Sequence, residues 1–171
     1  MTKNISLGSL KIDITESPGQ VTYNVSGNVD DSFKHGDVPR VKSENIVLEL
    51  EGITAFNFCG VREWVFLIKD LGSLGKLTFT NCSIPMVDQF NMVPESIGTG
   101  SVESFFAPYV CEEHGDAEIL LDTTKDRIRI ENHDAPDRQC PKCQKLLIFD
   151  AMPDSYFLFL TPVNIKLGKA S

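Results

Sequence analysis

The amino-acid sequence predicts an α/β fold followed by a small β-rich segment of different chemistry. Up to about residue 105, stretches with the alternation of β-strands are followed by stretches with the period of α-helices. Beyond that point the chain carries three of its five cysteines and two of its three histidines. Its 171 residues, 42% of them hydrophobic and 23% charged, are enough to bury a substantial core.

The first strands are predicted from alternating apolar and polar residues. Residues 10–14 and 21–25 alternate in this way, and Ser17, Pro18 and Gly19 form a turn between them, so we expect a hairpin. The polar residues 27–44 are expected to form a loop. Residues 46–50 are almost continuously apolar, which predicts a central strand covered on both faces.

A helix is predicted from Gly60 to about Gly72. Its apolar side chains recur at helical spacing, at Val61, Trp64, Val65, Ile68 and Leu71. Residues 76–80 then read as a strand, and residues 85–90 as a second helix with Pro85 in its first turn. Strands that alternate with helices predict parallel pairing with right-handed crossovers.

The remaining elements are expected in a segment of residues 106–150 and an end segment of residues 151–171, after a first domain of residues 1–105. Residues 118–121 and 127–130 both alternate, which predicts a second hairpin. Residues 132–139 are polar and predict a loop, and residues 145–149 read as a strand. The apolar stretch from Asp154 to Pro162 is expected to pack back on the core as helix or strand.

The charge of the chain limits its partners. Sixteen Lys and Arg residues against 24 Asp and Glu residues give a net charge of −8. This balance repels phosphate backbones and anionic membranes, so it argues against nucleic-acid and membrane partners. The absence of an apolar stretch of membrane-spanning or signal-peptide length predicts a cytoplasmic protein. Because cytosolic thiols are kept reduced, we expect paired cysteines to hold a metal.

Two pairs of residues have the spacing of metal ligands. Cys111 and His114 are separated by two residues, as are Cys140 and Cys143, and residues 115–139 lie between the pairs. A gap of two residues lets a tight turn direct both side chains to one ion. The sequence therefore predicts a structural Zn²⁺ site of three cysteines and one histidine, with His133 as a competitor for His114.

Other interpretations of the cysteines remain open. They could be reduced surface thiols without a metal. A redox Cys-x-x-Cys pair would need a helix after Cys140 to lower its pKa, whereas a strand is predicted there. A zinc deaminase would need a proline before Cys140 and a His-x-Glu motif, and the chain has Gln139 and His114-Gly115-Asp116 instead. Four protein ligands also leave no position for an activated water, so we expect no catalysis at the metal.

The basic residues of the second segment raise a third class of function. The cluster comprises Lys125, Arg127, Arg129, Arg138, Lys142 and Lys145. A surface that binds nucleic acid is one interpretation of this cluster. A solvated face is the other, and it is the usual role of such runs of charged residues. No nucleophile with a base, phosphate loop or carboxylate pair stands out, so the sequence predicts a protein that is not an enzyme.

Residues 46–60 resemble the signature of STAS domains, the family of bacterial anti-sigma-factor antagonists. In that family an acidic residue, a phosphorylatable Ser, a small residue and Gly follow a buried strand, and these positions are Asn57, Phe58, Cys59 and Gly60 here. Residues 76–83 and Pro85 resemble the next strand and helix start. The resemblance spans about residues 10–93. It implies a mixed sheet of four or five strands with helices on one face, and docking to a regulatory protein kinase or another signalling component.

The chain departs from the family at the regulatory position. Phe58 has no hydroxyl to accept phosphate, so it serves either as a permanent apolar contact for a partner or as a core residue. Arg62 and Phe66 step along the outer face of the same helix and complete the expected partner surface. Other side chains are expected to be buried, namely Trp64, Cys59 and Cys82, and His35 is expected to be solvated.

Two functional hypotheses follow from these observations. The first is a non-catalytic signalling or scaffold module, a STAS-like domain with a zinc-ribbon-like segment. The alternative is a thiol-redox protein or enzyme that uses Cys140 and Cys143.

Overall fold

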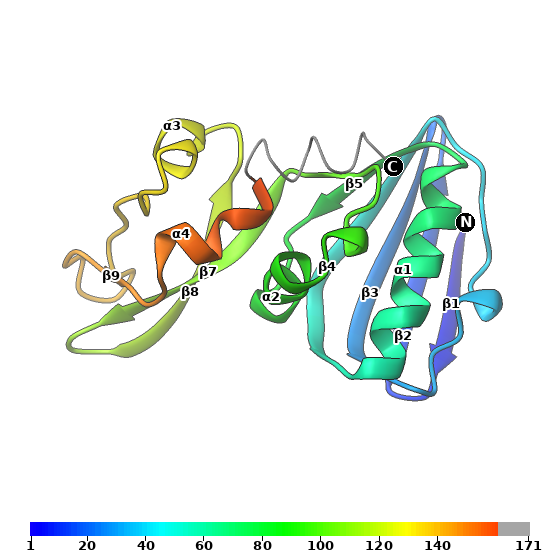
Figure 1. Ribbon diagram of the computed structural model, residues 1–171, viewed down its shortest axis with the longest axis horizontal. Coiled ribbons are helices and arrows are strands. Elements are labelled where there is room, and N and C mark those ends of the chain that lie inside the picture. The colour runs from blue at the N-terminus through cyan, green and yellow to red at the C-terminus, as the bar shows by residue number, and fades with distance from the viewer. Residues whose placement is uncertain (161–171) are drawn as a thin grey trace.

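The computed structural model describes residues 1–160, which form two lobes (Figure 1). The larger lobe has a six-stranded sheet with helices on one face, and the smaller lobe has a three-stranded antiparallel sheet. The prediction of a mixed α/β fold with a small β-rich addition is confirmed. No helix within these residues is long and apolar enough to cross a membrane.

The larger sheet has its strands in chain order. They are β1 (Thr2–Leu7), β2 (Leu10–Ser17), β3 (Gln20–Val29), β4 (Asn45–Phe56), β5 (Lys76–Thr80) and β6 (Ser101–Val102). β1, β2 and β3 pair antiparallel, and β3 to β6 pair parallel. The helices of this lobe are α1 (Phe58–Gly72) and α2 (Ile84–Met92), with short 3₁₀ turns η1 (His35–Asp37) and η2 (Pro94–Ser96).

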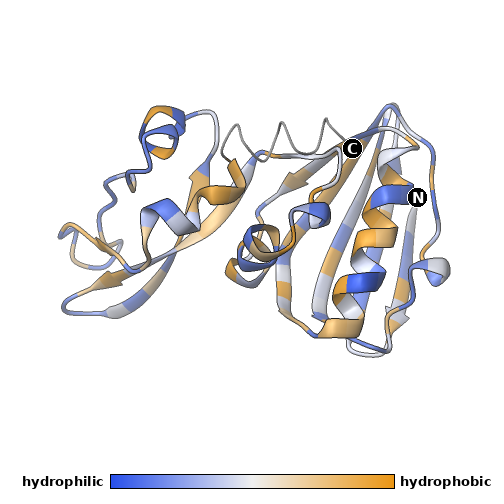
Figure 2. Ribbon diagram, viewed as in Figure 1, coloured by the Kyte–Doolittle hydropathy of each residue, from blue (hydrophilic) through white to orange (hydrophobic). Residues whose placement is uncertain are grey.

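The predicted first hairpin and central strand are both present. β4 lies between β3 and β5, and it buries Ile46, Leu48 and Leu50 completely. Its other face carries Val47 and Glu49, which are only half-buried. The expectation that this strand is covered on both faces was therefore wrong, because α1 and α2 cover one face and the other is open. Figure 2 shows the resulting alternation of hydrophobic and hydrophilic residues along the strands.

Helix α1 begins close to the predicted residue. The side chain of Asn57 caps it by accepting a hydrogen bond from the Gly60 N–H at 2.8 Å. Gly60 lies against the end of β3, where a Cβ atom would come within 1.9 Å of the Val29 carbonyl oxygen. Trp64 is fully buried, as expected.

The two cysteines outside the predicted ligand pairs differ in burial. Cys82 is buried, as predicted. Cys59 is exposed, so the prediction that it belongs to the core was wrong. The reason is helical geometry, because Cys59 shares a face with Arg62 and Phe66, three and seven residues later, and both of those side chains are exposed.

The smaller lobe contains the remaining elements of residues 1–160. They are β7 (Ser104–Cys111), β8 (Gly115–Asp122), α3 (Arg127–Glu131), β9 (Ile148–Phe149), α4 (Pro153–Tyr156) and the 3₁₀ turn η3 (Leu158–Leu160). The strand order is β8-β7-β9, and both pairs are antiparallel.

The predicted second hairpin was wrong, because its second arm is helical. The hairpin is instead formed by β7 and β8, which turn at residues 112–114. Arg127–Glu131 forms α3, where Ile130 is buried, Ile128 is exposed and Arg127 pairs with Glu131 one turn later. Four alternating residues fit a single helical turn as well as a strand. The predicted strand at residues 145–149 is reduced to β9.

An aromatic cluster joins the two lobes. The ring of Phe105 at the start of β7 contacts Phe157 and Phe159, and Phe159 contacts Phe90 of α2. The Asn91 side chain donates to the Tyr156 carbonyl and accepts from the Phe159 N–H. Residues 153–160 thus pack back on the core, while residues 161–171 of the predicted end segment lie outside the described residues. The division into residues 1–105, 106–150 and 151–171 stays a prediction.

Candidate metal centre

The four predicted ligands lie at two turns of the smaller lobe. Cys111 is the last residue of β7, and His114 ends the turn before β8. Gly115 adopts φ +79°, a conformation that glycine reaches without steric cost, and it pairs with Cys111 across the hairpin. This tight closure directs the side chains of Cys111 and His114 toward the same space.

The second turn is held by backbone hydrogen bonds. The Cys140 N–H donates to the Lys145 carbonyl at 2.8 Å, and the Gln144 N–H donates to the Cys140 carbonyl at 2.7 Å. Gln144 closes this loop with φ 62°. The loop brings the sulfur atoms of Cys140 and Cys143 to the side that faces the first turn.

The four ligand atoms form a compact group. They all lie within 4.8 Å of one another, close enough to hold a metal ion. The Nδ1 atom of His114 is 3.5 Å from the Cys111 sulfur and 3.6 Å from the Cys140 sulfur, and the sulfurs of Cys111 and Cys143 are 3.6 Å apart. Residues 26 positions or more apart in sequence are thus brought together by the two turns.

The protein environment favours the metal-binding form of Cys140. The backbone N–H of Cys143 donates to its sulfur, and with a smaller contribution from the Lys142 N–H it lowers the pKa of the Cys140 thiol to about 6. Cys111 and Cys140 are buried, whereas His114 is exposed. Thiolates are the form in which cysteine binds metals, so these backbone hydrogen bonds favour Cys140 as a ligand of the candidate site.

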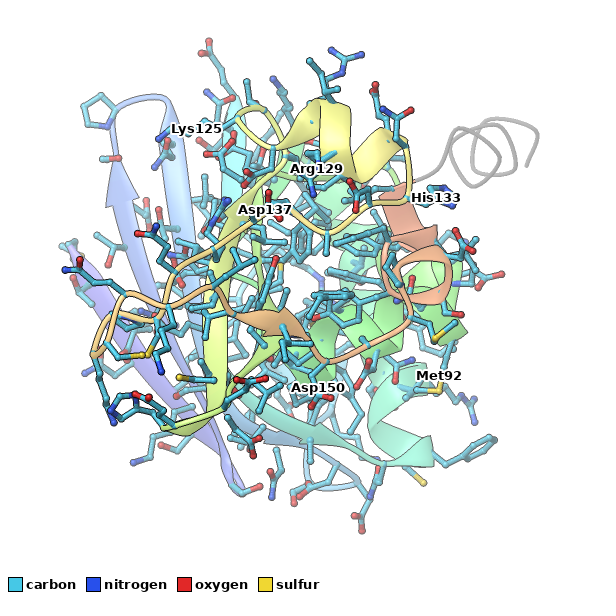
Figure 3. The ribbon with its side chains drawn as sticks, turned by 90° about the vertical axis from the view of Figure 1, so that its left-hand side faces the viewer. Met92, Lys125, Arg129, His133, Asp137 and Asp150 are labelled. Carbon is cyan, nitrogen blue, oxygen red and sulfur yellow. The ribbon has the colours of Figure 1, made fainter. Side chains whose placement is uncertain are left out.

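His133, the predicted competitor for His114, does not join the group. Its Nδ1 atom lies 2.9 Å from the Asp154 carboxylate, and the residue adopts φ 53° in the loop after α3. Figure 3 shows His133 at the border of the lobe beside α4, away from Arg129 and Asp137. The histidine of the candidate site is therefore His114.

Most of the predicted basic cluster is paired with carboxylates. Arg138 contacts both Asp126 oxygens at 2.7 Å, and Arg129 pairs with Asp134 and Asp137, the latter visible in Figure 3. Two further ion pairs join Arg127 to Glu131 and Lys145 to Glu113. These pairs neutralise much of the positive charge that favoured a nucleic-acid surface.

The three residues of the expected partner surface are exposed on α1. Phe58 is 90% exposed and Phe66 is 40% exposed. The Arg62 guanidinium carbon lies 5.8 Å from the centre of the Phe66 ring. Phe58 is therefore a surface residue and not part of the core.

His35 supports this surface, although it was expected to be merely solvated. Its ring lies 5.1 Å from the Phe66 ring, and its Nδ1 atom lies 2.5 Å from Glu63. The His35 N–H also donates to Glu63 at 2.9 Å, which lowers the pKa of that carboxyl group. These contacts fix the loop of residues 34–38 to the outer face of α1.

No protein-family model matches this chain, and no curated protein is significantly similar to it.

Two residues at the candidate metal centre were not predicted from the sequence to contact each other there. Lys145 and Glu113 form an ion pair that joins the two ligand turns. Glu113 lies between Cys111 and His114, and Lys145 follows Cys143. Opposite charges beside the two ligand pairs are the signal that could have indicated this contact.

Proposed function

We propose that the protein is a non-catalytic docking module whose smaller lobe is held by one structural zinc ion. The observation that carries this proposal is the spacing of the ligand atoms. Tetrahedral zinc with bonds of about 2.3 Å to sulfur and about 2.0 Å to nitrogen needs sulfurs about 3.8 Å apart and sulfur-to-nitrogen distances of about 3.5 Å. The distances of 3.6 Å between Cys111 and Cys143 and of 3.5 Å between Cys111 and His114 fit this geometry.

The donor set favours zinc over harder ions. Three thiolates and an imidazole suit Zn²⁺, whereas Mg²⁺ and Ca²⁺ prefer oxygen ligands. Four protein ligands complete a tetrahedron, so the ion would have a structural role and no open position for a reacting water. The smaller lobe has only short strands and helical turns, so binding of the ion would add to its folding free energy.

Elemental analysis tests this proposal. Protein purified without added metal should contain about one equivalent of zinc per chain, because a closed cysteine-rich site binds zinc tightly. A Cys59→Ser variant, which changes an exposed cysteine outside the group, should retain the same content. A folded sample with less than about a tenth of an equivalent would contradict a site of the expected affinity.

We further propose that the larger lobe is a STAS-like domain that docks to a signalling protein in the bacterial cytoplasm. The order of strands and helices, the close approach at Gly60 and the exposed surface of Phe58, Arg62 and Phe66 support this proposal. The partner would be a regulatory kinase, an anti-sigma-like protein or another signalling component. Because Phe58 has no hydroxyl, docking would not be controlled by phosphorylation at this residue.

A thiol-redox function is the second candidate. The lowered pKa of Cys140, near 6, favours it because the thiolate is the reactive form. Thiol titration with and without a chelator separates the two functions. Thiols that become reactive as one equivalent of zinc is released support the structural site, whereas a disulfide that is readily oxidised and reduced supports the redox function.

A further inference from the structure

The strand β8 has a free edge. It is the terminal strand of its sheet, and the backbone groups of residues 116–121 form hydrogen bonds only to β7 among the residues that the structure describes (Figure 1). Its pairing with β7 is continuous, without a bulge, and its sequence contains no proline or lysine. Bulges, prolines and lysines are features that protect sheet edges. Because β8 has none of them, its edge is open to a further strand.

The outer face of β8 carries one exposed apolar side chain between acidic ones. The register places Leu120 opposite Phe106 on this face. Leu120 is 45% exposed. Alternation along β8 places Ile119 on the opposite face, where it is half-buried. An added strand would cover apolar surface on both faces of β8.

The charge of β8 indicates which kind of strand fits. Asp116 and Glu118 share the outer face with Leu120, and both are exposed. Neither carboxylate forms an ion pair with a basic side chain among residues 1–160. A second copy of β8 is a poor partner, because this strand carries three carboxylates and no cation, and like charges on neighbouring strands are destabilising.

We propose that the free edge of β8 binds an extended basic segment of a partner protein. The segment adds a strand to the sheet through backbone hydrogen bonds and places Lys or Arg beside Asp116 and Glu118. The aliphatic stem of a further Lys covers Leu120 on the same face, and apolar side chains of the segment lie beside Ile119 on the other face. This surface is separate from the one on α1, and the interaction goes beyond the proposed docking of the larger lobe.

A synthetic peptide tests the proposal directly. The probe is an eight-residue peptide of alternating Lys and Val, acetylated and amidated at its ends, and its binding is measured by fluorescence anisotropy. Hydrogen exchange of the complex should show new protection in residues 116–121. The same peptide N-methylated at both its lysines and its valines has no backbone N–H at these residues on either edge, so it should bind at least about tenfold more weakly.

Charge reversal at two sites distinguishes binding at the edge of β8 from general attraction of the basic probe to an acidic protein. The variant Asp116→Lys with Glu118→Lys should lose at least about tenfold in affinity for the probe, because each attraction becomes a repulsion. Asp13→Lys with Glu16→Lys changes the net charge equally at exposed positions of β2 and should leave the affinity within about twofold.

Several outcomes would overturn the proposal. Equal weakening in both variants would show that only net charge attracts the probe. The same conclusion follows if the N-methylated peptide binds as well as the parent. Protection at the edge strand β1 in place of residues 116–121, absence of binding at millimolar peptide, or a dimer that forms through β8 in sedimentation would also contradict it. None of these results depends on the identity of the metal.

Discussion

At the scale of single residues, the choice of histidine is the sharpest test of the metal site. His114→Ala removes a ligand atom that lies 3.5 Å from the Cys111 sulfur. Replacing a residue that only hydrogen-bonds to a metal ligand already lowers metal affinity about 10-fold to 100-fold. Loss of the ligand His114 itself should lower the affinity at least as much. His133→Ala, whose side chain pairs with Asp154, should leave the affinity unchanged. Competition with a chromophoric chelator measures both, and equal affinities in the two variants would exclude His114 as a ligand.

The ligand residues were predictable because their spacing is local. Two residues between ligands define a turn that presents both side chains, and this holds whatever the rest of the chain does. The choice between His114 and His133 was not predictable, since it depends on the path of the loop after α3 and on the contact of His133 with Asp154. The exposure of Phe58 was also not predictable, because it depends on how the start of α1 packs against the rest of the molecule.

The surface of α1 gives a second prediction at this scale. Phe58→Ser and Phe66→Ala should each weaken binding of a partner recovered by pull-down by at least about tenfold, because exposed aromatic residues are frequent anchors of interfaces. Both variants should keep their free energy of unfolding within about 0.5 kcal/mol, as is usual for surface positions.

A matched control for these variants is Ile128→Ala, which removes an exposed apolar side chain on α3. Its affinity for the partner should equal that of the unchanged protein. If Phe58→Ser and Phe66→Ala also bind unchanged while folded, the docking surface is not on α1.

At the scale of elements, the start of α1 depends on one close approach. In Gly60→Ala the new methyl group would meet the Val29 carbonyl oxygen, and the Cβ position lies 1.9 Å from that atom. The helix must shift away from β3, which should lower the free energy of unfolding by about 1–3 kcal/mol. Urea denaturation measures this change. Gly36→Ala, where the added atom meets nothing within 4 Å, is the control and should cost much less.

Long elements were predicted more accurately than short ones. The fifteen residues of α1 repeat the helical period several times, so their pattern is unambiguous. Arg127-Ile128-Arg129-Ile130 covers one helical turn, and its alternation fits a strand equally well. Its helical state depends on contacts elsewhere, such as the burial of Ile130. Strand β1 was missed because its exposed residues show no dense apolar run.

At the scale of the whole molecule, the hydrophobic cores of the two lobes are joined to each other. The aromatic contacts of Phe90, Phe105 and Phe159 run without a break from α2 to the smaller sheet. The sequence indicated a change in chemistry near residue 105 but not this continuity, because the contacts join residues far apart in the chain. The larger lobe also has a core of its own between its sheet and its two helices, where Leu48 and Trp64 are fully buried.

Removal of a metal ligand tests how strongly the lobes depend on each other. Cys140→Ser should loosen the smaller lobe, because one of four ligands is lost and the binding free energy of the ion no longer supports its turns. The larger lobe should stay folded on its own core. Hydrogen exchange should therefore increase in residues 104–149 and remain slow in β3, β4 and β5, with Cys59→Ser as the matched control. Loss of protection in both lobes together would show instead that the shared aromatic core makes the molecule a single cooperative unit.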